Sequence, residues 1–201
     1  MKITSIKQQV KRADRYSVFV DGKYSFSLSE SALLTQGLHS GQELDTIQLE
    51  ALKEASGTDK AYGNALRYVA MRPRSIWELE TYLKRKDVDE PVAESIIKRL
   101  EAVGLLDDTA FAKAWVNNRR LLKSTSRRKL QLELKQKHVP SGIIDAVLRE
   151  EGADDRTALR ELVEKKRARY PDQNKFMQYL ARQGFGYDDI KSVLQEDNDE
   201  Y

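Results

Sequence analysis

The sequence has no cysteine and only two histidines, which excludes several classes of protein. Without cysteine there is no disulfide, no thiolate zinc site and no cysteine nucleophile. His39 and His138 are far apart in the chain, in different expected domains, so they do not suggest converging metal ligands. The glycine-rich phosphate loop and the Gly-x-Ser-x-Gly elbow are also missing. We therefore expect a protein that is not an enzyme and uses no cofactor.

Long apolar runs are missing as well. The first residues, Met1–Lys7, lack the apolar stretch of a signal peptide. No segment approaches the roughly 18 apolar residues that a membrane-spanning helix needs. Of the 201 residues, 40% are hydrophobic and 33% are charged, which suits thin cores under a well-solvated surface. These features predict a soluble, cytoplasmic, monomeric protein with no membrane partner.

An internal repeat organises the chain. Three segments begin at Ser75, Ser126 and Asp172, and each has apolar residues at the same four later positions. In order along the segments, these are Leu79, Leu130 and Phe176, then Leu83, Leu134 and Leu180, then Val88, Val139 and Phe185, then Ile97, Leu148 and Leu194. A repeat with a period of roughly 45–50 residues is typical of a helical array.

The residues before the array predict a small β and α cap. Asp21-Gly22 separates two β-branched and aromatic runs, a strong hairpin signal because both turn residues need positive φ. Ile3, Ile6 and Val10 could supply a third strand. A short helix then begins near Ser29 and a second spans 46–55, and the Ser56-Gly57 pair predicts a break before the first helix of the array.

The predicted fold is mainly α. It consists of three tandem three-helix repeats that form an elongated, curved array behind a small N-terminal β-hairpin and α cap. The expected divisions are 1–57 for the cap, 58–106, 107–152 and 153–196 for the repeats, and 197–201 for an acidic tail. An extended array suits a long groove or a filament better than a small-molecule pocket.

Three aspartate pairs are the only residues that suggest catalysis. They are Asp107-Asp108, Asp154-Asp155 and Asp188-Asp189, and each precedes a predicted helix, so N-capping explains them. His138 falls where the other repeats have Asp87 and Gly184, which is a helix C-terminal position. A magnesium-dependent nuclease that uses Asp107 and Asp108 stays an alternative, but the sequence favours no catalytic and no metal-binding residue.

The charge distribution is more informative. Between Phe111 and Pro140 there are nine basic residues, and Glu133 is the one acidic residue. Acidic partners at helical spacing are therefore absent from this stretch. The bland interpretation is a solvated helix face. Because uncompensated like charge costs stability, we favour a surface that contacts a polyanion or an acidic protein.

Several motifs resemble the RecX family of recombinase regulators. They recur in order over the first two repeats: Tyr68-Val69-Ala70-Met71-Arg72-Pro73-Arg74-Ser75, Glu78-Leu79, Leu83-Lys84-Arg85-Lys86, Gly104-Leu105-Leu106-Asp107-Asp108, Phe111-Ala112 and Trp115-Val116. The third repeat is more divergent. The resemblance implies tandem three-helix repeats and a protein that binds the RecA recombinase filament on single-stranded DNA. It also implies inhibition of recombinase activity in DNA repair and the SOS response.

The expected contact surface for RecA and DNA is the set of basic residues in the first two repeats. These are Arg72, Arg74, Lys84, Arg85, Lys86, Arg119, Arg120, Lys123, Arg127, Arg128, Lys129, Lys135 and Lys137. The DNA partner is single-stranded and could also be double-stranded. The main alternative is an autonomous DNA-binding protein that contacts the backbone without sequence preference, and a purely structural scaffold also stays open.

Overall fold

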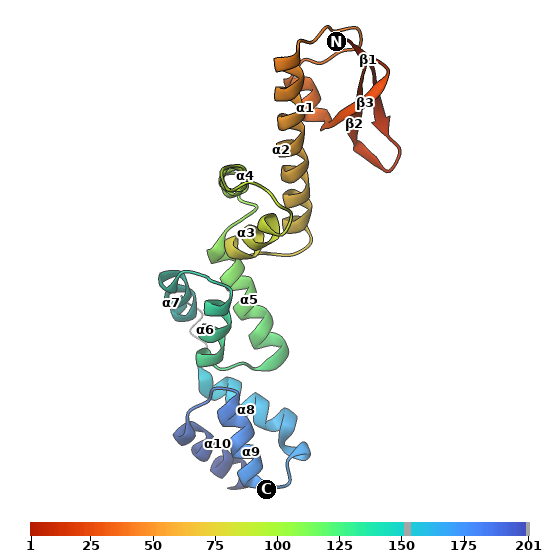
Figure 1. Ribbon diagram of the computed structural model, residues 1–201. Coiled ribbons are helices and arrows are strands. Elements are labelled where there is room, and N and C mark those ends of the chain that lie inside the picture. Colours follow the sequence, from red (N-terminus) through yellow and green to blue (C-terminus); the bar gives the residue numbers. More distant parts are fainter. Residues whose placement is uncertain (151–153, 200–201) are drawn as a thin grey trace. The chain divides into compact units, whose positions relative to one another are not determined.

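The computed structural model describes residues 1–150 and 154–199, and these form two compact units. The first unit combines Met1–Arg72 with Leu79–Leu105, and the second combines Pro73–Glu78 with Leu106–Tyr201. Figure 1 shows the elements of each unit along the chain. The strands are β1 Ile3–Gln9, β2 Arg12–Val20 and β3 Lys23–Ser29. The helices are α1 Glu30–Thr35, α2 Thr46–Ala70, α3 Ile76–Lys84, α4 Glu90–Ala102, α5 Asp108–Lys123, α6 Arg127–Gln136, α7 Ser141–Glu150, α8 Asp155–Lys166, the 3₁₀ helix η1 Arg167–Arg169, α9 Gln173–Arg182 and α10 Tyr187–Asp199.

The N-terminal strands form an antiparallel sheet in the order β1-β2-β3. The predicted turn is confirmed, since Asp21 and Gly22 both have positive φ, at 47° and 80°. The third strand that Ile3 and Ile6 suggested is β1. The sheet buries Val18, Leu28 and other apolar residues against α1 and α2, so it is supported by the helices that follow.

α2 is one continuous helix of 25 residues (Figure 1), so the predicted break at Ser56-Gly57 is wrong. Asp45 caps its start in a capping box with Gln48. Ser56 has a tertiary role, because its Oγ donates a 2.7 Å hydrogen bond to the carbonyl of Ser27 in β3. The first half of α2 therefore packs on the sheet, and the second half is the first helix of the first repeat.

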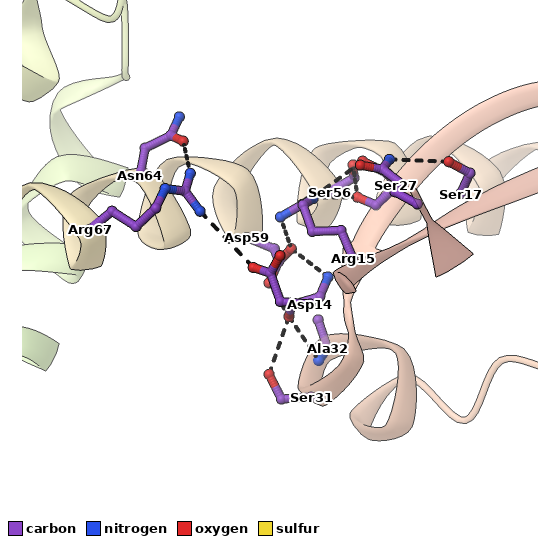
Figure 2. A network of polar contacts seen from close by, with 12 residues as sticks. Asp14, Arg15, Ser17, Ser27, Ser31, Ala32, Ser56, Asp59, Asn64 and Arg67 are labelled. Atoms are coloured by element: carbon purple, nitrogen blue, oxygen red, sulfur yellow. Dashed lines mark hydrogen bonds and ion pairs between the residues drawn. The ribbon is translucent and has the colours of Figure 1, made fainter. Parts of the chain in front are cut away.

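A buried ion pair joins the sheet to α2 (Figure 2). The Arg15 guanidinium is 3% exposed and lies 2.9 Å from the Asp59 carboxylate, which is 14% exposed. Arg15 also donates to the carbonyl of Ser27 at 2.7 Å, and Asp59 accepts from the backbone N–H of Ser29 at 2.8 Å. Charged groups this buried require such partners. This network fixes the sheet on one side of α2.

The three tandem helical repeats are confirmed. The apolar residues four and eight positions after each repeat's starting residue are all fully buried: Leu79, Leu130, Phe176, Leu83, Leu134 and Leu180. The positive φ expected where the second helix ends is also found, at 52° for Asp87, 55° for His138 and 94° for Gly184. The register read from the sequence therefore identifies the core of each repeat.

The chain beyond residue 150 agrees with the prediction only in part. α10 extends through residue 199, so the first three residues of the predicted acidic tail belong to a helix. The last two tail residues lie outside the described residues. The sequence also predicts that Gly152 ends the third helix of the second repeat, and this residue lies outside the described residues as well. In the third repeat, burial raises the pKa of Tyr179, which stacks on Tyr170.

Candidate partner-binding surface

A buried serine precedes the second helix of the first two repeats. Ser75 and Ser126 are 0% exposed, and each Oγ accepts a 3.2 Å hydrogen bond from a backbone N–H, that of Glu78 and that of Lys129. Both serines begin a repeat segment in the sequence, and serine is a favoured N-cap. Their burial was not predicted, and it shows that these helix starts are packed against other parts of the chain.

The aspartate pairs explain part of this packing. Asp188 and Asp189 lie in the first turn of α10, so the third pair does not precede its helix. In the other two pairs the first aspartate caps the following helix, as predicted. The second has another role. Asp108 accepts from the backbone N–H of Ile76 at 2.9 Å, and Asp155 accepts from that of Arg127 at 2.7 Å. In both cases the donor is the first residue of a second helix, so capping alone was the wrong explanation for Asp108 and Asp155.

This geometry gives the nuclease alternative no support, because both carboxylates of its Asp107-Asp108 pair accept backbone hydrogen bonds. In the part of the chain that the structure describes, no three His, Cys, Asp or Glu side chains are grouped so that they could hold a metal ion. Nor does any helix there have the length and apolar character needed to cross a membrane.

The beginning of α3 packs against the end of α6, and we call this contact the first joint. The Trp77 and His138 rings stack with centroids 4.4 Å apart. Next to them, Lys137 Nζ lies 2.7 Å from the carboxylate of Glu78, whose side chain is 8% exposed. An aromatic stack thus fills the first joint, and the ion pair neutralises the charges of Glu78 and Lys137.

The same positions one repeat later form a second joint, between α6 and the end of α9. Ser126 Oγ donates a 2.7 Å hydrogen bond to the carbonyl of Gln183. Lys129 Nζ lies 2.6 Å from the side-chain oxygen of Gln183, a neutral partner. Gly184 approaches so closely that a Cβ atom there would lie 2.5 Å from Ser126 Oγ. The close approach of the two helices at the second joint therefore requires glycine at position 184.

Most basic residues between Phe111 and Pro140 have partners that the sequence did not reveal. Arg119 lies 2.7 Å from Glu133, and its guanidinium stacks 4.6 Å from the Trp115 ring. Arg120 pairs with Asp155 at 3.2 Å. Lys113 pairs with Glu150, and Lys137 with Glu78 as described above. The inference that acidic partners are absent is wrong for these residues, because most of the acids come from other segments.

The remaining predicted contact residues differ in availability. Lys129 is held at the second joint. The backbone N–H of Arg127 donates to Asp155, and its guanidinium donates to the carbonyl of Leu148 at 3.0 Å. The exposed members whose side chains make no hydrogen bond or ion pair with any described residue are Lys84, Arg85, Lys123, Arg128 and Lys135. In the first unit, the exposed Lys86 lies 6.0 Å from the Tyr82 ring, and Arg72 is exposed. Arg74 is half-buried in the second unit.

Comparison with known proteins places these observations in a family. The description "Regulatory protein RecX N-terminal domain" matches residues 1–45. The first, second and third three-helix domains of RecX match residues 61–100, 107–148 and 154–194. A relative from Halalkalibacterium halodurans, named "Regulatory protein RecX", is 37% identical over 150 residues, which cover 73% of this chain. The chain belongs to the RecX family.

Other RecX relatives cover more of the chain. The "Regulatory protein RecX" of Bacillus subtilis is 30% identical over 210 residues, 98% of this chain and 79% of that protein. The match with the Halalkalibacterium RecX covers 56% of that protein's length, and a match with a Lactobacillus johnsonii RecX covers 54%. The chain thus spans little more than half of these two relatives. They are named as regulatory proteins, not as enzymes.

Solved RecX structures have the same fold. One, described as "Crystal structure of regulatory protein RecX", aligns with a TM-score of 0.73 and 30% identity over 96% of this chain and 98% of its own. A RecX from Lactobacillus salivarius aligns with a TM-score of 0.62 and 29% identity over 71% of this chain and 97% of its own. The tandem three-helix architecture is therefore that of RecX.

The contact between α8 and the end of α5 should respond to acid. A hydrogen bond from Ser124 Oγ and the nearby Lys165 ammonium lower the pKa of Glu161 below its ordinary value of 4.5. A lowered folded-state pKa stabilises the protein at neutral pH, and this stabilisation is lost as pH falls through that pKa. We expect the urea midpoint of Glu161→Gln to fall less steeply below about pH 4.5 than that of the unmodified protein. Glu164→Gln, at an exposed position of the same helix, is the control. Equal acid dependence in all three proteins would contradict this role for Glu161.

Proposed function

We propose that this RecX-family chain regulates the RecA recombinase by binding the filament that RecA forms on single-stranded DNA, and that it inhibits recombinase activity in DNA repair and the SOS response. The observation that carries the proposal is the ordered match to the N-terminal and three helical domains of RecX. The proposal includes a monomer in the cytoplasm that also contacts single- or double-stranded DNA. It keeps the division at 1–57, 58–106, 107–152 and 153–196.

The surface charge supports this function. Lys84, Arg85 and Lys123 are exposed and make no ion pair with any described residue, so their charge is available to a partner. Lys84 ends α3, Arg85 directly follows it, and Lys123 ends α5. A protein that engages a filament through several weak contacts gains from the high effective concentration of each further contact. A basic surface near bound DNA also gains affinity from counterion release, which weakens with salt.

A charge-reversal variant tests this surface. With RecA and single-stranded DNA, the unmodified chain should inhibit DNA-dependent ATP hydrolysis and strand exchange. The variant Lys84→Glu, Arg85→Glu and Lys123→Glu should need about tenfold more protein for half-inhibition at physiological salt, because like charges then oppose the anionic partner. Residues 127 and 129 are left unchanged because both side chains are hydrogen-bonded within the second unit.

The control makes the same charge change at exposed sites outside the predicted surface. Lys60, Arg149 and Lys191 are exposed, their side chains make no hydrogen bond or ion pair with any described residue, and they are changed to glutamate together. This variant should inhibit nearly as well as the unmodified protein. If the two triple variants inhibit equally, the predicted surface is wrong. If the unmodified chain leaves both RecA activities unchanged, the proposed function is wrong.

The second candidate function is sequence-independent DNA binding without a recombinase. It is favoured by Arg128 and Lys135, which are exposed on α6 and make no ion pair with any described residue. Titrating DNA over a salt series, with and without RecA, separates the two functions. Tight DNA binding with no effect on RecA would favour the second.

A further inference from the structure

The two joints of the second unit use equivalent positions with different residues. Counted from Ser75 and Ser126, the second position is Trp77 in one and Arg128 in the other. The third is Glu78 and Lys129. The residue that ends the partner helix is His138 at the first joint and Gly184 at the second, and both have positive φ. The two joints therefore have equivalent backbone positions, and their side chains can be compared directly.

At the first joint these positions satisfy one another. Trp77 stacks on His138, and the Glu78 carboxylate neutralises Lys137. No net charge remains between these side chains, and the rings fill the space between the helices. The contacts within the first joint therefore explain why these four side chains are present, without any external partner.

At the second joint, the residues at the equivalent positions form neither a ring stack nor an ion pair. An arginine replaces the tryptophan and a glycine replaces the histidine, so no ring stack can form. A lysine replaces the glutamate and contacts only the neutral Gln183 amide among the described side chains. An open groove of about 470 Å³ lies here between α6 and the end of α9. It is lined by Arg128, Lys129, Gln131, Leu132, Lys135, Ala181, Arg182 and Gly184.

The groove is strongly cationic. Four of its lining residues are basic, and no acidic residue lines it among the described residues. Arg128, Lys135 and Arg182 are exposed, and their side chains make no hydrogen bond or ion pair with any described residue. A basic groove that no acid of the described chain neutralises is suited to an external anion.

We propose that this α6–α9 groove binds the phosphodiester backbone of single-stranded nucleic acid. The inference deepens the proposed function, on which it rests, by assigning the DNA contact to specific residues. Guanidinium groups match phosphate oxygens in a two-point geometry, which suits Arg128 and Arg182. No aromatic ring lines the groove among the described residues, so it provides no platform for base stacking. Contact through the backbone alone is independent of base sequence.

The arrangement of the cations favours nucleic acid over an acidic peptide. Arg128 and Lys135 are seven residues apart on one face of α6, which separates them by about 10 Å along the helix axis. They are therefore spread along the groove and do not converge on one anion. A nucleic acid strand carries one negative charge on every unit whatever its sequence. A peptide would need acidic residues at matching positions.

The test measures binding of a fluorescent oligothymidylate to the full chain, without a recombinase, over a salt series. The variant Arg128→Gln, Lys135→Gln and Arg182→Gln should bind at least about tenfold more weakly at low salt. The slope of log K against log salt should become shallower by about 2, because each lost phosphate contact contributes roughly 0.7 for single strands. These side chains are exposed, so the variant should fold normally, which circular dichroism can verify.

The control variant Lys60→Gln, Arg149→Gln and Lys191→Gln has the same net charge and should retain most of the affinity. If both variants lose the same affinity for the oligonucleotide, binding depends on net charge alone, and the assignment of the DNA site to the groove is wrong. Oligoglutamate of matched charge is the second probe. If it binds the groove as tightly as the oligonucleotide, the site is one for acidic protein surfaces, and the nucleic-acid assignment fails.

The experiments can disprove the DNA site in the groove and the proposed regulatory function independently of each other. If the groove variant binds DNA normally and still inhibits RecA, the groove is wrong and the function stands. If the unmodified chain binds the oligonucleotide through the groove but leaves RecA unaffected, the phosphate site stands and the regulatory function fails.

Discussion

Replacing Arg15 with alanine should lower the free energy of unfolding of the first unit by about 3–5 kcal/mol, the range for breaking a buried ion pair by removing one partner. The change leaves the Asp59 carboxylate, 14% exposed, without its cation. It also removes one of the two side-chain donors to the carbonyl of Ser27, the other being Ser56 Oγ. Because the network in Figure 2 joins β2 and β3 to α2, the sheet should separate from the helix before the repeats unfold.

The position of the tryptophans makes this measurement selective. Trp77 and Trp115 are the two tryptophans of the chain, and both belong to the second unit. Hydrogen exchange of the β1–β3 amides should therefore accelerate in the Arg15 variant, whereas the fluorescence transition in urea should change little. Arg67→Ala is the matched control, because Arg67 and Asp14 form a 4.0 Å pair that is exposed on both sides. Exposed pairs contribute about 0–1 kcal/mol. Similar effects of the two substitutions would show that the buried pair has no special importance.

Replacing Gly184 with alanine should destabilise the second unit by about 2–4 kcal/mol. Its φ of 94° is costly for any residue with a Cβ atom, by about 1–2 kcal/mol. The new Cβ would also lie 2.5 Å from Ser126 Oγ and 3.4 Å from the backbone nitrogen of Lys129. Overpacking of this kind costs about 1–3 kcal/mol, since the helices must move apart.

Gly104→Ala separates the two contributions to this cost. Gly104 has a φ of 70°, but a Cβ atom there would meet nothing within 4 Å. Only the backbone cost of about 1–2 kcal/mol should remain. Urea unfolding followed by tryptophan fluorescence measures the Gly184 effect, and circular dichroism measures both. If the two alanine variants are equally stable, the close approach of Ser126 to Gly184 does not hold the second joint together.

The repeat cores could be predicted because their signal is local and occurs three times. Leu79, Leu130 and Phe176 occupy one register position, and all three are fully buried. The left-handed backbone at Asp87, His138 and Gly184 was predictable for the same reason. Patterns of helical spacing depend on neighbours within a few turns, which a sequence displays directly.

The features that were missed depend on distant segments. The acidic partners of Arg120 and Lys137 are 35 and 59 residues away, so spacing within a helix could not reveal them. The continuity of α2 was missed because Ser56-Gly57 is typical of a turn. A glycine inside a helix costs only about 1 kcal/mol, and Ser56 gains a hydrogen bond to β3. At the second joint, the signal that could have been used was the change from Trp77 and Glu78 to Arg128 and Lys129 at equivalent positions.

The continuity of α2 has a geometric consequence for the first unit. A helix of 25 residues is about 37 Å long, and each residue turns the chain by about 100°. The sheet is attached to the first half of this helix, and the second half is the first helix of a repeat. The direction in which the sheet faces, as seen from that repeat, is therefore set by the number of residues between the two attachments. One inserted residue in that interval would turn the sheet by about 100° around the helix axis. Seven inserted residues make about two turns, so they would return the sheet nearly to its original direction, about 10 Å farther along the axis.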